Sequence, residues 1–453
     1  MADRSDRLLT AAVAASVAVA FADSSIVVLA LPALYTDFHT SLTGVSVVIT
    51  SYNLVVFVGA FALVPFTRRL HVREVTRVGL ALFTVGSIGC AAAWDLASLV
   101  AFRCIQGAGG ALLLAGALPL LGALAGGPAR GGRIWTSTGT FGAALGPALG
   151  GVLTQLADRR AIFAFQAPVA AVALAATFDR RVHELPVEEP GPRRREATVA
   201  NAGLALVFAG LVGALFLSVL LVITVWQRRP IAGALIVSAL PAAAFLVRPL
   251  VARLGRREAV TAGALLLAAG LVALALLPAI SNTVLAISLA FCGLGLGLAV
   301  PVLTADSIDP ERAPLRSGTI TVCARHLGLV ASVALIAPLL THELDASQVP
   351  ATLAGTRVIL DGNIDLTKKV PIALDMRDEF VSAQRGAIPN LATPFDDRGA
   401  KTDPSLRALR DTLLDTLRGA VTRAFRLSFL LSALFALLAL VPARMLREKE
   451  PDP

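Results

Sequence analysis

The chain has 453 residues, of which 56% are hydrophobic and only 16% are charged, and its mean hydropathy is +0.75. A soluble domain usually has about 45–50% apolar and about 25% charged residues, so this composition excludes a large soluble protein and indicates a polytopic membrane protein. The net charge of +9 does not favour nucleic-acid binding, because the basic residues occur in small clusters between apolar runs.

Apolar runs long enough to cross a bilayer recur along the whole chain. The hydrocarbon core requires about 20 apolar residues per helix, and on that rule the sequence predicts about twelve spanning helices. They are 8–32, 44–66, 75–94, 97–125, 133–155, 161–178, 199–225, 231–250, 259–278, 283–303, 317–340 and 423–443. The first run is longer than the core of a signal peptide, so we interpret it as an uncleaved spanning helix.

The basic residues predict the orientation. Most of them lie at the N-terminus, in every second loop and in the C-terminal tail, whereas the alternate short loops hold only Arg159, Arg160, Arg228 and Arg229. Basic loops stay in the cytoplasm. We therefore expect a multi-pass protein of the cell membrane with both termini cytoplasmic, which agrees with an even number of spans.

A charged, proline-rich segment, 179–197, is too polar to span and divides the chain. We expect it to be a cytoplasmic linker between an N-terminal half, 1–178, and a C-terminal half, 198–453, with about six spanning helices in each. Two repeated halves around a site near the bilayer midplane are a common plan of transporters. The predicted fold class is an all-α integral membrane protein.

A second polar segment, 341–422, is predicted to be a long extracytoplasmic insertion between the last two spans. Within it, Asp403 and Pro404 are typical of an N-cap and a first-turn proline. The leucines that follow at helical spacing are Leu406, Leu409, Leu413 and Leu417. Two interpretations stay open: an amphipathic helix on the membrane surface or the transporter mouth, or a helix that extends the last span outward.

Charged residues inside predicted spans need a reason, because each costs a few kcal/mol in the bilayer. They are Asp23, Arg103 and Arg325, with His326 beside the last. The functional hypothesis makes Asp23 a proton or cation site and Arg103 its partner. It makes His326 a further proton carrier, because histidine can change charge near neutral pH. The structural alternatives are a fixed ion pair, an arginine that snorkels to the interface and a histidine that is simply hydrogen-bonded.

Polar groups in the spans are candidates for the substrate cavity. We include Asn53, Gln106 and Arg325, since each can hydrogen-bond a neighbouring helix or a substrate. The sequence has neither a phosphate-binding loop for ATP-driven pumping nor a cysteine or histidine spacing typical of a metal site. No catalytic constellation stands out. We therefore expect no enzyme activity, metal or cofactor, and an ion gradient as the energy source.

The fifth predicted span carries glycines at every fourth position. Gly142, Gly146 and Gly150 share one helical face, which lets a neighbouring helix approach closely. Pro147 lies in the same run, removes a backbone hydrogen bond and is expected to kink the helix. Together with Gly151, these residues predict either a moving contact or ordinary tight packing.

These stretches resemble motifs of the major facilitator superfamily, and within it of the drug:proton antiporters of the multidrug-resistance branch. The segment 142–151 resembles the antiporter motif of helix five, and 103–109 resembles the RxxQGxG motif of helix four. The segment 23–32 is similar to the first-helix motif of the fourteen-helix branch. Segments 161–168 and 324–328 resemble that branch's entry into helix six and its RQLG stretch.

The resemblance implies a major-facilitator-type fold that works by alternating access of two six-helix halves. It implicates Arg103 in proton coupling, and Gly146 and Pro147 in the conformational change. Two departures stand out. Arg68 and His71 replace the usual aspartate and glycine of the loop between helices two and three, and the chain has about twelve predicted spans where the motifs resemble a branch with fourteen.

The leading hypothesis is a secondary active exporter of amphipathic, drug-like small molecules coupled to proton influx. One alternative is an exporter of a lipid or cell-envelope precursor that uses the 341–422 segment. Another is a non-transporting sensor or scaffold relative, which the altered loop allows but the retained intramembrane charges disfavour. The expected partners are a small amphipathic or lipidic substrate, protons and the bilayer, without nucleic acid, and the expected state is a monomer.

Overall fold

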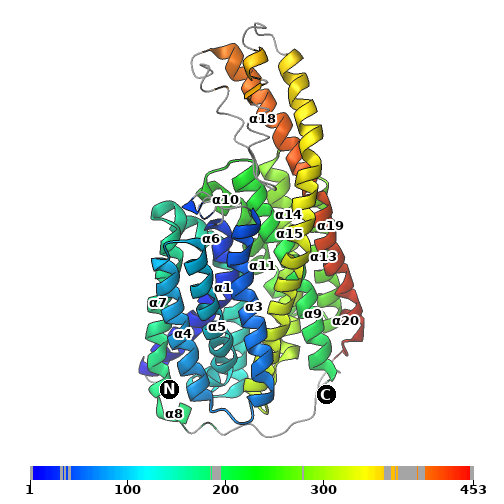
Figure 1. Ribbon diagram of the computed structural model, residues 1–453. Coiled ribbons are helices and arrows are strands. Elements are labelled where there is room, and N and C mark those ends of the chain that lie inside the picture. Colours follow the sequence, from blue (N-terminus) through cyan, green and yellow to red (C-terminus); the bar gives the residue numbers. More distant parts are fainter. Residues whose placement is uncertain are drawn as a thin grey trace.

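The computed structural model describes residues 4–30, 34, 37–38, 42–183, 185, 195–277, 280–361, 369–372, 374–375, 395 and 403–448. These residues form a bundle of long helices with a narrow helical stalk at one end (Figure 1). No strand occurs in this part of the chain. The start of α1 and the end of α20 both lie at the end of the bundle opposite the stalk (Figure 1).

The helices follow the predicted apolar runs. Those before the central linker are α1 (Arg4–Ile26) with the 3-10 turn η1 (Val27–Ala30), α3 (Leu42–Leu63) with η2 (Val64–Phe66), α4 (Val72–Ala92), α5 (Leu96–Leu124), α6 (Pro128–Leu156), α7 (Arg159–Leu174) with η3 (Ala175–Phe178), and α8 (Arg180–His183). Most of the linker, 186–194, lies outside the described residues.

The helices after the linker include more interruptions. They are α9 (Arg195–Val212) with the π-helical turns η4 (Gly213–Leu217) and η5 (Leu220–Val225), α10 (Pro230–Val237), α11 (Ala239–Leu246), α12 (Arg248–Val251), α13 (Arg256–Ala275), α14 (Asn282–Ser307), α15 (Pro314–Asp361), α18 (Pro404–Ala424), α19 (Arg426–Leu438) and α20 (Leu440–Met445).

Eleven helices of the described chain are long and apolar enough to cross a membrane. The helix α6 is not among them, although it has 29 residues, because its glycines and threonines lower the mean hydropathy. Side-chain caps fix several helix starts: Asp95 accepts from the Ser98 backbone N–H, Asp158 from Ala161 and Ser281 from Val284. Such caps satisfy the backbone donors that a helix start leaves unpaired.

Neighbouring helices pack within two groups and across one seam. In the first group α1 lies on α6 and α7, and α4 lies on α5 and α7. In the second group α13 lies on α14 and α19, and α9 lies on α14 and α15. Across the seam, α15 contacts α3 and α5, while α10 and α11 contact α6. The residues that fill this seam are where a substrate path between the groups would run.

The stalk corrects the prediction for the eleventh span. That span was expected at 317–340, but α15 continues as one helix to Asp361. The polar residues after 340 can remain helical because a second helix packs against one side of them. The partner is α18, whose start is the predicted Asp403 cap and Pro404. Between 362 and 402, few residues are described.

The leucine stripe of α18 faces protein. The buried core of the stalk consists of Ile359, Ile372, Phe395, Leu406, Leu409, Leu413, Leu417 and Ala420. Trp226 donates to Thr422 at 3.1 Å, and Arg418 donates to Gln227 at 2.9 Å, so the base of α18 is anchored to the bundle. The structure therefore favours a helix that extends the last span outward over one that lies on the membrane surface.

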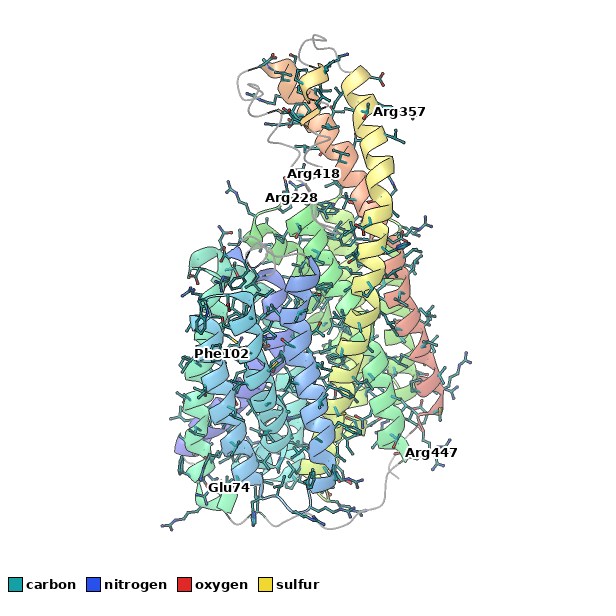
Figure 2. All side chains as sticks on the ribbon, in the orientation of Figure 1. Glu74, Phe102, Arg228, Arg357, Arg418 and Arg447 are labelled. Atoms are coloured by element: carbon teal, nitrogen blue, oxygen red, sulfur yellow. The ribbon has the colours of Figure 1, made fainter. Side chains whose placement is uncertain are left out.

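The charged side chains labelled in Figure 2 lie at the two ends of the bundle and along the stalk. Glu74 and Arg447 lie at the end opposite the stalk, whereas Arg228, Arg418 and Arg357 lie at its base and along it (Figure 2). The belt between these ends exposes large apolar side chains, as expected for a surface that faces lipid.

Candidate functional site

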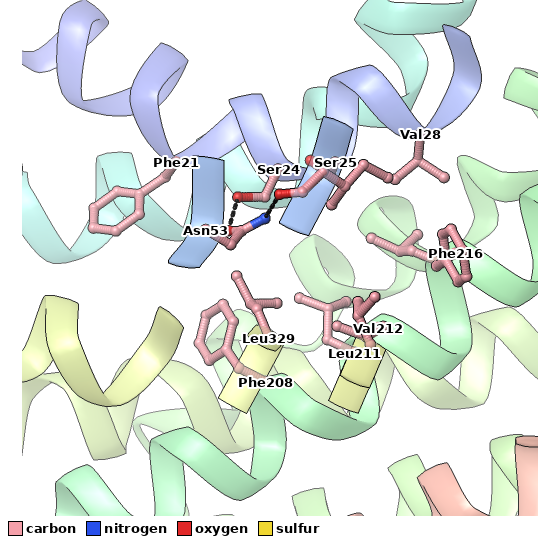
Figure 3. Close-up of a pocket in the computed structure, with 13 residues that line it drawn as sticks. Phe21, Ser24, Ser25, Val28, Asn53, Phe208, Leu211, Val212, Phe216 and Leu329 are labelled. Atoms are coloured by element: carbon pink, nitrogen blue, oxygen red, sulfur yellow. Dashed lines mark hydrogen bonds between the residues drawn. The ribbon is translucent and has the colours of Figure 1, made fainter. Parts of the chain in front are cut away.

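A cavity lies in the seam, between α1 and α3 on one side and α9 and α15 on the other (Figure 3). It contains about 510 Å³ of empty space, open space at its mouth included. Of the described side chains that line it, only Ser24, Ser25 and Asn53 are polar. Ser24 donates to Asn53 Oδ1 at 2.7 Å, and Asn53 donates to the Ile49 carbonyl at 2.9 Å. A mostly apolar lining with a few polar groups is typical of sites for small amphipathic ligands.

A buried charge pair lies on the opposite side of α1. Arg103 Nη1 approaches Asp23 Oδ2 to 2.6 Å, and both side chains are fully buried. The pair is a charge contact without the alignment of a hydrogen bond, so Oδ2 accepts no hydrogen bond from the described residues. The other oxygen, Oδ1, accepts from Gln166 at 2.9 Å and from Gln106 at 3.4 Å.

Two glutamines connect this pair to further helices. Gln106 accepts from Arg103 at 2.6 Å and donates to Ser87 at 2.9 Å and to Gln166 at 3.0 Å. The cluster therefore joins α1, α4, α5 and α7 in one polar network inside an apolar bundle. A buried charge needs such partners, because an unpaired one is costly in a low-dielectric interior.

Arg103 also holds α3, one wall of the cavity. Its Nε donates to the Val48 carbonyl at 3.1 Å, and its guanidinium lies 4.4 Å from the centre of the Tyr52 ring. The next residues along α3, Ile49 and Asn53, line the cavity. The charge pair and the cavity thus share α1 and α3, although no charged side chain of the pair enters the cavity.

The structure brings together three of the predicted residues, Asp23, Arg103 and Gln106, and places Asn53 in the cavity wall. Sequence reasoning missed Gln166 and Ser87, which complete the network. The signal for Gln166 was present, since it is an uncharged polar residue in the sixth apolar run, the same criterion that selected Gln106.

Arg325 lies apart from that network, at the end of the cavity formed by Phe21 and Phe208. Its guanidinium carbon is 3.8 Å from the centre of the Phe21 ring and 4.3 Å from that of Phe208. Its side chain is 1% exposed, and Nη2 makes one long contact of 3.5 Å with the Gly139 carbonyl. Burial at this depth rules out snorkelling to the interface.

His326 points into packed surroundings. Its Nδ1 lies 2.8 Å from the Val322 carbonyl of the same helix, and its ring packs on Phe21 and Tyr52. This is the arrangement expected of a hydrogen-bonded structural histidine. It does not belong to the Asp23–Arg103 network.

The glycine face of α6 lies directly against α1. A methyl group on Gly142 would collide with the Ala18 carbonyl, on Gly146 with the Ser25 side chain and Ala22 carbonyl, and on Gly150 with the Ile26 carbonyl. Only glycine permits this approach. The packing places α6 against the helix that carries both Asp23 and the cavity residues Ser24 and Ser25. The helix α6 continues past Pro147 and Gly151 to Leu156.

Spanning helices, a buried charge network and an apolar cavity in the seam define a multi-pass membrane transporter. The sequence model described as "Major Facilitator Superfamily" matches residues 13–333. This chain belongs to that superfamily.

Similar proteins agree with this assignment. The multidrug resistance protein Stp of Mycobacterium tuberculosis is 26% identical over 403 residues, which cover 73% of this chain and 75% of Stp. The fold is similar to that of a bacterial homologue of the human lysosomal transporter Spinster, with a TM-score of 0.57, 14% identity and full coverage of both chains. The xylose transporter XylE from E. coli aligns with a TM-score of 0.54 and 15% identity over 72% of this chain and 90% of its own.

Proposed function

We propose that the protein is a secondary active exporter of amphipathic small molecules, driven by inward proton movement through alternating access. The observation that carries the proposal is the buried Asp23–Arg103 pair. Asp23 lies on α1 and Arg103 contacts α3, and both of these helices also line the cavity. The relationship to a multidrug resistance protein supports export of small molecules.

The geometry suggests how a proton would act. A proton on Asp23 Oδ2 removes the negative charge that Arg103 faces at 2.6 Å. Arg103 then loses its charge partner but retains contacts with Val48 and Tyr52 on α3. Gln106 and Gln166 can re-pair with the neutral carboxyl group. Because α1 and α3 also form the cavity wall, a shift of Arg103 changes the side of the cavity from which a substrate leaves.

The glycine face contributes the moving contact in this proposal. With glycine at positions 142, 146 and 150, α6 contributes no side chain of its own where these residues meet α1. Such a contact permits one helix to slide or tilt against the other at little steric cost. We also propose that the halves move about the seam, with 1–178 as one half, 198–453 as the other and 179–197 as a cytoplasmic linker.

The test is transport in liposomes that contain the purified protein. Release of a fluorescent amphiphile is measured with and without an imposed proton gradient, for two dyes of matched apolar body and opposite permanent charge. We expect gradient-dependent movement of at least one dye, and loss of that dependence in Asp23→Asn and Arg103→Ala. Movement that is equal with and without the gradient would contradict the proposal.

A matched acid provides the control. Asp37 also pairs with an arginine, since its Oδ2 lies 2.7 Å from Arg159 Nε, but its side chain is 50% exposed. Asp37→Asn removes the same charge outside the buried network and should retain gradient-dependent movement. If Asp37→Asn and Asp23→Asn were equally impaired, the buried position of Asp23 would carry no special role.

Export of a lipid or envelope precursor is the alternative that the stalk was thought to favour. The leucines that would have faced a lipid surface are buried against α15 and its neighbours, so this alternative loses its main support. Removal of 345–418 distinguishes the two, because small-molecule export should persist without the stalk. Loss of lipid export alone in that variant would restore the alternative.

A further inference from the structure

Arg325 is a buried cation that has no counter-ion among the described residues. In the described part of the chain its Nε and Nη1 have no hydrogen-bond partner, and no carboxylate lies within ion-pair distance. Two aromatic rings attract a guanidinium, yet they accept none of its directed N–H bonds. Arg103 makes the contrast clear, because Asp23, Gln106 and the Val48 carbonyl surround it.

The place of Arg325 connects it to the cavity. The two rings that enclose its guanidinium, Phe21 and Phe208, also line the cavity, and so does Leu329, one turn further along α15. Figure 3 shows Phe21 and Phe208 together at one end of the lining residues. Contact between the guanidinium and a molecule in the cavity would require a change of rotamer at one of these rings.

Among the described residues that line the cavity, none could neutralise a cation. Its polar side chains are Ser24, Ser25 and Asn53 among the described lining residues, and none is acidic. The nearest intramembrane carboxylate on α1, Asp23, is already paired with Arg103 on the other side of the helix. An organic cation in this cavity would therefore lack a partner, whereas an anion would find one in Arg325.

We infer that Arg325 is the substrate-binding group of the transport path and that the substrate is an anionic amphiphile. Its carboxylate, sulfonate or phosphate group accepts from the unsatisfied Nε and, in place of the long Gly139 contact, from Nη2, because these two donors share one edge of the guanidinium and suit two oxygens of one acid group. Its apolar body occupies the cavity lined by α1, α3, α9 and α15. This inference rests on the proposed export function and specifies the charge of its substrate.

The experiment measures binding with a charge-matched pair of probes. Purified protein is titrated with 1-pyrenesulfonate and with trimethyl(1-pyrenylmethyl)ammonium, which differ mainly in the sign of a permanent charge. We expect the wild type to bind the sulfonate more tightly. Arg325→Met should weaken sulfonate binding about ten- to hundredfold, the usual value of hydrogen bonds to a charged group, and leave the cation little changed.

Two further variants separate binding from folding. Arg325→Lys keeps the charge without the planar fork and should restore part of the sulfonate affinity. Arg160→Gln, at an exposed position, removes the same charge away from the cavity and should bind like the wild type. Equal loss of both probes in Arg325→Met, or a wild type that prefers the cation, would overturn the inference.

Competition identifies the source of the anion. Decyl phosphate, a single-chain amphiphile, should displace the sulfonate, whereas inorganic phosphate should not, because it has no apolar body for the cavity. Displacement by phosphatidic acid in mixed micelles but not by decyl phosphate would still support an anionic head group and would assign it to a membrane lipid. Displacement by decanol as strong as that by decyl phosphate would overturn the inference.

The two proposals can fail separately. If the cationic dye moves with the proton gradient and Arg325→Met leaves that movement unchanged, the export proposal stands and the anion inference fails. If neither dye depends on the gradient while the sulfonate preference depends on Arg325, the anion inference stands and proton coupling fails.

Discussion

The two buried arginines of this protein occupy opposite environments. Arg103 has a carboxylate at 2.6 Å and a glutamine at 2.6 Å, whereas Arg325 lies between two phenylalanine rings with two nitrogens unsatisfied by the described residues. Both contact helices that form the wall of the same cavity. The difference teaches that a carboxylate balances the charge of the first arginine, while no described residue balances that of the second, whose Nε and Nη1 retain unused binding capacity.

The paired arginine gives the largest expected effect. Asp23→Ala leaves Arg103 as an uncompensated buried charge, which should lower the free energy of unfolding by about 3–5 kcal/mol. Thermal unfolding of the purified protein measures it. The double variant Asp23→Ala/Arg103→Met removes both charges and should recover most of the loss. A double variant no more stable than Asp23→Ala would contradict the assigned pairing.

The helix α1 carries Asp23, which pairs with Arg103, and Phe21, which contacts Arg325. Its position depends on close packing against the glycine face of α6. Gly142→Ala places a methyl group against the Ala18 carbonyl and should destabilise the protein by about 1–3 kcal/mol, as overpacking does. Gly419→Ala in α18 is the control, since only Arg423 Nη1 lies within 4 Å of the new methyl group, at 3.9 Å. There we expect no loss, or a gain of up to about 1 kcal/mol from the reduced backbone entropy of the unfolded chain. Equal losses would exclude close packing as the cause.

The unpaired arginine should respond with the opposite sign. Arg325→Met removes a buried cation but keeps most of the apolar stem, and we expect a stabilisation of about 1–2 kcal/mol, after the lost ring contacts are subtracted from the relieved desolvation. The same unfolding assay measures it beside Asp23→Ala. Destabilisation as large as that of Asp23→Ala would mean that Arg325 has a structural partner and would remove the contrast.

Arg181 lies at the end of the bundle opposite the stalk (Figure 1). It shows what an arginine–aspartate pair contributes to stability when it is partly exposed to water. Arg181 contacts Asp6 at 2.7 Å and Asp179 at 2.8 Å, and its hydrogen bond holds the pKa of Asp179 below its usual value. Because Arg181 is 38% exposed, Asp179→Asn should cost less than about 1 kcal/mol.

The lowered pKa of Asp179 predicts how its contribution to stability changes with pH. Asp179 stabilises the fold above the pKa of an unfolded aspartate, about 3.9, and this contribution disappears as the pH falls through the lower folded value. The difference between wild type and Asp179→Asn should therefore persist from pH 7 to about pH 5 and shrink below about pH 4. A difference that grows on acidification would contradict the assigned pair.

Much of the fold could be predicted because membrane insertion depends on local composition. The apolar runs place the helices within a few residues, and Asp403 with Pro404 correctly marks the start of α18. Two features were not predictable in this way. The polar end of α15 is helical only because α18 covers it, and η4 and η5 interrupt the regular hydrogen bonding of the long helix after α9.

For the candidate site, too, some residues could be predicted from the sequence, whereas their contacts could not. Charged and polar residues in apolar runs identified Asp23, Arg103, Gln106 and Arg325, because each is conspicuous where its transfer from water is costly. Their partners were not visible. Gln166 reaches Asp23 across 143 positions of the chain, and nothing in the local pattern around either residue specifies that contact.

By itself, the sequence determined that this protein is a helical membrane protein, which segments are strongly apolar and which of them carry charge, since hydropathy is a sum over neighbouring residues. The tertiary structure alone decided that Asp23 meets Arg103 while Arg325 meets two aromatic rings, and that the leucines of α18 face a helix. Those outcomes depend on which faces of distant helices meet, a property of packing between elements that no single segment contains.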